Sequence, residues 1–108
     1  MDFEEFRQRY AAEMADAIKA LDPRWGVRKY KAHGTSNGVA YVFTLTDEGS
    51  PVAWVEDEGR GGGPRIDWVR PRADAAVQQA FDAEAKRLFS VGVPGEDMVE
   101  AILQRAGK

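Results

Sequence analysis

The sequence predicts an α+β fold in which a four-stranded antiparallel meander has helices packed on one face, in the order α-β-β-β-β-α-α. Apolar residues recur every three or four positions near both ends of the chain, which is the period of an amphipathic helix. Alternating runs occupy the centre, and short glycine-containing turns separate them. We expect a single domain over residues 1–108, since a chain of this length suits one core.

The first helix is expected over residues 2–21. Its apolar stripe consists of Phe3, Phe6, Tyr10, Met14, Ala17 and Leu21. Asp2 suits the N-cap, and Pro23 ends the helix because the residue before a proline is disfavoured in the α region. We expect the stripe to face the core. The alternative is that it fills a groove on a partner.

The strands differ in how clearly they alternate. A first strand is expected over residues 25–32, although Arg28, Lys29 and Lys31 disturb its pattern, and residues 33–38 form a turn cluster. The next strand, 39–46, alternates without interruption. One face carries Val39, Tyr41, Phe43 and Leu45, and the other carries Ala40, Val42, Thr44 and Thr46. We expect the second set to line the open sheet face, together with basic and aromatic neighbours.

The last two strands form a hairpin in which two short apolar runs, 52–55 and 66–69, flank an acidic loop rich in glycine. We expect at least one of Trp54 and Trp68 to be buried between the sheet and the helices. Two helices follow, one starting near Pro71 and stopping by Gly92, the other running from Pro94 to Gly107.

Composition limits the class of protein. Hydrophobic residues make up 44% of the chain and charged residues 31%, which is ordinary for a globular protein. No apolar run approaches a membrane span, the N-terminus is acidic, and cysteine is absent. We therefore expect a cytoplasmic protein, monomeric or homodimeric, with no membrane partner.

Few residues suit chemistry. His33 is the only histidine, so no histidine pair or thiolate cluster can hold a metal. We expect no catalytic residues, no metal and no cofactor. The opposing hypothesis, a small enzyme or metal-binding protein, needs a pocket that joins His33 to the acids at 56–58. Consecutive strand residues point to opposite faces, which opposes convergence of those acids.

The charges are segregated along the chain, and the glycine loop concentrates them. A predicted partner-binding set comprises Glu56, Asp57, Glu58, Arg60 and Arg65, whose arginines suit a carboxylate or phosphate. A phosphate-binding loop is not favoured, because no Lys-Ser/Thr pair follows the glycines. The competing interpretation is a hairpin tip that glycine shapes for structural reasons.

An alternative function is nucleic-acid binding by a basic and aromatic sheet face. The residues predicted for it are Arg24, Arg28, Lys29, Lys31, Arg65, Arg70, Arg72, Trp25 and Tyr30.

The segment Asp57-Glu58-Gly59-Arg60-Gly61-Gly62-Gly63-Pro64 carries a resemblance. It is similar to the "asparagine or aspartate, any residue, glycine, any residue, glycine, glycine" segment that follows a strand in small uncharacterised proteins of bacteriophages and bacteria. This chain departs from the pattern by a third glycine before the proline. The resemblance implies a phage or prophage origin. With no convergent catalytic set, we expect a non-enzymatic interaction module that binds and inhibits a host protein or protein–nucleic acid complex, such as a defence system.

Overall fold

The computed structural model describes residues 2–69 and 75–108, and within them the elements follow the predicted order. The helices are α1 (Phe3–Ala20), α2 (Ala75–Leu88) and α3 (Pro94–Arg105). The strands are β1 (Trp25–Thr35), β2 (Gly38–Asp47), β3 (Ser50–Asp57) and β4 (Arg65–Trp68). The α+β class and the antiparallel meander are thereby confirmed. The start of α2 predicted at Pro71 lies outside the described residues.

Two units, each compact, make up the chain. One consists of Met1–Asp22 with Gln79–Lys108, and the other is Pro23–Gln78. The first unit contains α1, α3 and most of α2, and the second contains the whole sheet. A single domain with the helices on one sheet face stays a prediction.

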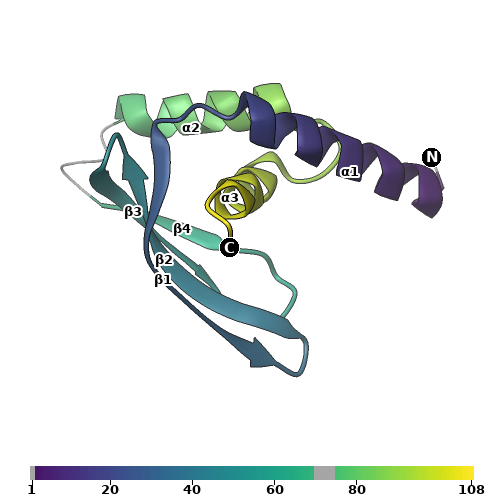
Figure 1. Cartoon of the computed structure of the whole chain (residues 1–108), viewed down its shortest axis with the longest axis horizontal. Coiled ribbons are helices and arrows are strands. Elements are labelled where there is room, and N and C mark those ends of the chain that lie inside the picture. Colours follow the sequence, from purple (N-terminus) through teal and green to yellow (C-terminus); the bar gives the residue numbers. More distant parts are fainter. Residues whose placement is uncertain (1, 70–74) are drawn as a thin grey trace. The chain divides into compact units, whose positions relative to one another are not determined.

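The sheet unit has its strands in the order β1-β2-β3-β4, each antiparallel to the next (Figure 1). β1 is longer than predicted, because residues 33–35 pair with 38–40 and leave only a two-residue turn at 36–37. The turn between β2 and β3 is formed by Glu48 and Gly49, whose φ angles of 50° and 87° are both positive. Two positive φ values match the twist of the flanking strands, and this tight hairpin sets the pairs of Asp47 with Ser50 and of Thr46 with Pro51. The register then shifts by one residue, because Leu45 pairs with Ala53 and not with Val52.

The two faces of the sheet differ in burial at the centre of β2, where Phe43 and Leu45 are buried as its alternation predicts. At the ends of β2 the prediction is wrong: Val39 is 54% exposed, whereas Ala40 and Thr46, expected on the open face, are buried.

Phe43, Leu45, Ala53 and Val55 are all at most 2% exposed and lie on one face. The opposite face of β3 carries Trp54, which is 61% exposed. Alternation places Trp54 there, because its neighbours on both sides in the strand take the buried face.

The prediction that Trp54 or Trp68 is buried is therefore wrong. Trp68 is only half-buried, and the buried tryptophan is Trp25, at the start of β1, with 2% of its surface exposed.

In the helical unit, α1 begins as predicted: the Glu5 N–H donates to Asp2 Oδ1 at 2.8 Å. Its apolar stripe is buried only in the second half, where Met14 and Ala17 are covered. Phe3 and Phe6 are 75% and 38% exposed, contrary to expectation, because the first turns of α1 extend past α3 (Figure 1).

Polar contacts join the segments of this unit. The Glu13 carboxylate accepts hydrogen bonds from the Ser90 N–H at 2.7 Å, the Ser90 hydroxyl at 2.6 Å and the Val91 N–H at 3.1 Å. Arg105 donates to the carbonyls of Leu21 and Asp22 at 3.0 and 2.9 Å. The loop after α2 and the end of α3 are thus both tied to α1 and the residues that follow it. None of the described helices combines the length and apolar character that a membrane crossing requires.

Candidate interaction face of the sheet

Two rows of cross-strand neighbours occupy the sheet face that carries Trp54. Directly paired residues project to the same side of a sheet, so each row crosses all four strands on one face. The rows are Arg28, Thr44, Trp54 and Asp67, and then Lys31, Val42, Glu56 and Arg65. We call these eight residues, together with Lys29, the Trp54 face.

Trp54 lines two hollows of about 300 and 410 Å³. Lys29, Thr44 and Trp54 line both of them. An indole that is 61% exposed in the middle of a strand offers a large flat apolar surface beside open space. This arrangement suits contact with another molecule.

A β-bulge places Lys29 at these hollows. Arg28 pairs with Thr44 and Lys31 pairs with Val42, so two residues of β1 oppose a single residue of β2. Lys29 has φ 55°, a left-handed conformation that is uncommon for a residue with a side chain. Bulges of this kind redirect side chains, and strained backbone is concentrated at functional sites.

The cations of β1 on this face are not neutralised by any carboxylate in the described part of the chain. Among the described residues, neither Arg28, Lys29 nor Lys31 forms an ion pair with a carboxylate. On the β4 side, by contrast, Arg65 lies 3.3 Å from both Glu56 and Asp67. The face therefore has an uncompensated positive edge on β1 and an internally paired edge on β4.

Arg24, which was predicted to contact nucleic acid, instead binds residues of the sheet unit. It makes two hydrogen bonds of 2.8 Å to the Asp47 carboxylate and lies 4.7 Å from the centre of the Trp25 ring. These hydrogen bonds from Arg24 hold the pKa of Asp47 below its usual range. Trp25 is buried, so it offers no surface on which a base could stack.

The other residues of the nucleic-acid set lie in different surroundings. Arg28, Lys29, Lys31 and Arg65 belong to the Trp54 face. Tyr30 stacks with Tyr41, their ring centres 6.2 Å apart, and is half-buried. Arg70 and Arg72 lie outside the described residues.

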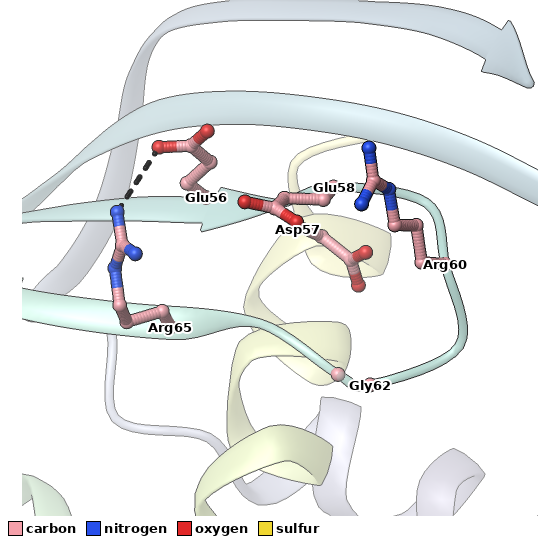
Figure 2. Close-up of a pocket in the computed structure, with 7 residues that line it drawn as sticks. Glu56, Asp57, Glu58, Arg60, Gly62 and Arg65 are labelled. Atoms are coloured by element: carbon pink, nitrogen blue, oxygen red, sulfur yellow. Dashed lines mark hydrogen bonds and ion pairs between the residues drawn. The ribbon is translucent and has the colours of Figure 1, made fainter.

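The structure brings the five predicted partner-binding residues around one hollow of about 240 Å³ at the glycine loop. Figure 2 shows the carboxylates of Glu56, Asp57 and Glu58 between the guanidinium groups of Arg60 and Arg65. The pair between Arg65 and Glu56 is solvent-exposed, with 64% and 48% of the two side chains accessible. Such pairs contribute at most about 1 kcal/mol, so the cluster leaves its charges accessible to other groups.

Backbone geometry accounts for much of the glycine in this loop. Gly59, Gly61 and Gly63 have φ angles of 75°, 85° and 81°, a region that side chains disfavour. Gly59 is also buried: its N–H donates to Asp57 Oδ1 at 2.8 Å, and its carbonyl accepts from the Thr35 hydroxyl at 3.0 Å. The interpretation as a glycine-shaped hairpin tip therefore accounts for the start of the loop. It also accounts for one carboxylate oxygen of Asp57, which accepts the hydrogen bond from Gly59.

The acids at 56–58 line one hollow, although strand alternation opposed their convergence, but His33 does not join them. His33 is exposed on β1 opposite Ala40 and does not line the hollow formed by the acids at 56–58. In the described ranges no three histidine, cysteine, aspartate or glutamate side chains are placed to share a metal ion.

Trp54 is a candidate site residue that the sequence-based prediction missed, although a signal for it exists. Trp54 and Glu56 share the parity of a strand, and a glutamate indicates the exposed side. Counting outward from Glu56 places Trp54 on the same exposed face.

Comparison of the chain with protein-family models, with curated proteins and with solved structures finds no match. A function for the protein therefore has to be inferred from the residues of this chain alone.

Proposed function

We propose that this protein is a non-enzymatic interaction module that binds an anionic macromolecular partner through the Trp54 face. The observation that carries the proposal is the position of an exposed indole beside three cations of β1 that have no carboxylate partner among the described residues. Aromatic and arginine side chains are enriched where proteins bind one another, and unpaired cations favour an anionic partner.

Charge on this face supports an anionic partner even though the whole chain carries a net charge of −3. Four cations stand against two carboxylates on the Trp54 face, and both carboxylates lie beside Arg65. The positive edge on β1 therefore attracts anions locally, while the acidity of the rest of the chain limits non-specific association.

The class of partner that we propose is the one that the sequence indicates. We expect a host protein or a protein–nucleic acid complex, in keeping with the phage origin that the glycine loop suggests. Inhibition of that complex, for example one of a defence system, stays a prediction.

Affinity capture from a bacterial lysate tests the proposal when matched variants are compared. We expect the parent protein to retain a partner that Trp54→Ala loses. Lys19→Ala, which removes an exposed cation of α1 that belongs to neither the Trp54 face nor the glycine-loop hollow, should retain it. Identical capture by the parent and Trp54→Ala would contradict the proposal, as would the absence of any retained partner.

A further inference from the structure

We infer that the group recognised by the Trp54 face is single-stranded nucleic acid. The inference rests on the proposed function and specifies its partner. A single strand offers unpaired bases with flat faces and a phosphate on every nucleotide. The Trp54 face offers a flat indole and a row of cations, so the two are complementary in both respects.

The indole is placed where a base can reach it. Trp54 is 61% exposed and lines two hollows, and Thr44 is its neighbour on β2. A base that stacks on Trp54 therefore meets a small side chain next to the indole. A polar threonine hydroxyl at this point can contact a base edge without selecting strongly among bases.

The cations follow one strand and can track a backbone. Arg28, Lys29 and Lys31 occupy four consecutive positions of β1 together with Tyr30, and the bulge directs Lys29 to the hollows that Trp54 lines. β1 and β3 are two strands apart, so about 10 Å separates the two backbones. Long basic side chains on β1 extend over this interval, which places phosphates beside β1 and a base over β3.

A single strand fits better than a duplex. The bases of a duplex are stacked on one another, and their faces are not available to Trp54. Reading a duplex groove requires a helix or a ribbon that projects into it, whereas the Trp54 face is the broad surface of a sheet. The paired edge formed by Glu56, Arg65 and Asp67 lies on β3 and β4, away from the expected phosphate path.

Fluorescence anisotropy tests the inference with labelled 15-nucleotide oligothymidine and oligouridine in 50 mM NaCl. We expect the intact protein to bind both. Trp54→Ala should weaken binding roughly tenfold or more, Trp54→Phe should restore most of the affinity, and Lys19→Ala, at an exposed cation of α1, should change little. Three phosphate contacts imply that affinity falls about twentyfold between 50 and 200 mM NaCl, and Lys29→Ala should reduce the logarithmic salt slope by about 0.7.

Three outcomes would overturn the inference: no binding of either oligonucleotide at tens of micromolar protein, equal binding by the parent and Trp54→Ala, or tighter binding to a labelled 15-residue oligoglutamate peptide. The last outcome would identify an acidic protein as the partner. Lysate capture separates these failures from failure of the proposed function. If Trp54→Ala loses a captured partner while oligonucleotides do not bind, the face remains a binding site and only its ligand has been misassigned. Circular dichroism of each variant confirms that the exposed substitutions leave the fold intact.

Discussion

Two arginines near the start of the sheet, Arg24 and Arg28, differ in whether they form an ion pair with a described residue. Arg24 is bound to Asp47 by two short hydrogen bonds, and 30% and 13% of the two side chains are exposed. Arg28, four residues on, forms no ion pair among the described residues. A bidentate, partly buried pair stabilises a fold more than an exposed single charge does.

We therefore expect Arg24→Ala to lower the free energy of unfolding by about 1–3 kcal/mol, because it leaves the Asp47 carboxylate without this partner. Arg28→Ala should change it by less than about 0.5 kcal/mol. The pKa of Asp47 is lowered by Arg24, so the stabilisation is fully present above the usual value of 3.8 and is lost as pH falls through the lowered pKa. Urea unfolding at several pH values should show that the difference in the free energy of unfolding between the parent and Arg24→Ala decreases below pH 3.8. A difference independent of pH would contradict this assignment.

The pKa of Asp97 is shifted in the opposite direction from that of Asp47, so its effect on stability has the opposite dependence on pH. Its Oδ1 accepts a hydrogen bond from the Tyr10 hydroxyl at 3.0 Å, while its buried Oδ2 has no hydrogen-bond partner in the described part of the chain. Burial raises the pKa of Asp97, the charges of Glu13 and Glu100 raise it further, and the bond from Tyr10 opposes this. Burial, followed by the nearby Asp97 charge, raises the pKa of Tyr10 to about 12.

A carboxyl with a raised pKa binds its proton more tightly in the folded state. Its ionisation therefore destabilises the fold, and that cost disappears as pH falls through the raised pKa toward 3.8. We expect Asp97→Asn to be at least as stable as the parent at pH 7, since a buried amide costs less than a buried carboxylate. Urea titrations should show the parent gaining stability relative to Asp97→Asn between pH 7 and pH 4. Tyr10→Phe is the control: it should lose about 1–3 kcal/mol, because it removes the bond to Oδ1.

At the scale of the element, the glycine loop contains positions with different requirements. A Cβ on Gly59 would lie 3.0 Å from Thr35 atoms and from the Ala40 nitrogen, and its φ is 75°. A Cβ on Gly62 meets nothing within 4 Å, and its φ is not positive. We expect Gly59→Ala to cost about 1–3 kcal/mol and Gly62→Ala less than about 0.5 kcal/mol in urea unfolding. Equal stability of the two variants would show that the loop is not held by Gly59.

The bulge in β1 makes a second comparison possible. Lys29→Gly should raise the free energy of unfolding by about 1 kcal/mol, because glycine adopts the left-handed conformation without strain. Lys31→Gly should lower it by about 0.5–1 kcal/mol, since Lys31 occupies a regular strand position. Both should weaken oligonucleotide binding. A Lys29→Gly variant that is more stable yet binds less well would show that the lysine serves binding at the expense of folding. A variant that is less stable than the parent would show that the backbone at Lys29 is not strained.

The sequence predicts some elements better than others for physical reasons. At the centre of β2 the buried positions of Phe43 and Leu45 follow from periodicity, and the Asp2 cap follows from side-chain chemistry. Periodicity does not predict the ends of β2, where Val39 is exposed and Thr46 is buried.

The register of β1 does not follow from periodicity, because the bulge adds a residue and Lys29, unlike a glycine, gives no sign of a positive φ. Trp54 is misassigned because its hydrophobicity suggests burial, whereas Ala53 and Val55 occupy the buried side.

At the scale of the whole molecule, different probes report the two units. Trp25, Trp54 and Trp68 all lie in the sheet unit, so tryptophan fluorescence reports that unit, and far-UV circular dichroism is dominated by the helices. Met98 on α3 is 0% exposed, whereas Val93 before that helix is 56% exposed. We expect Met98→Ala to lower the stability measured by dichroism by about 2–5 kcal/mol, and Val93→Ala to lower it by less than about 0.5 kcal/mol. A small effect of Met98→Ala would argue against a packed core in the helical unit.

The bulge also has a genetic consequence. Opposite one residue of β2, the chain carries two, Lys29 and Tyr30, and the pairs on either side keep Arg28 and Lys31 on the same face. Loss of the single codon for Lys29 would leave Tyr30 opposite Phe43 in a regular ladder, with every other side chain of β1 on the side it already occupies. Lys29 is thus equivalent to an in-frame insertion of one residue, which the sheet accommodates without reversing its faces. The insertion adds one cation to the hollows that Trp54 lines.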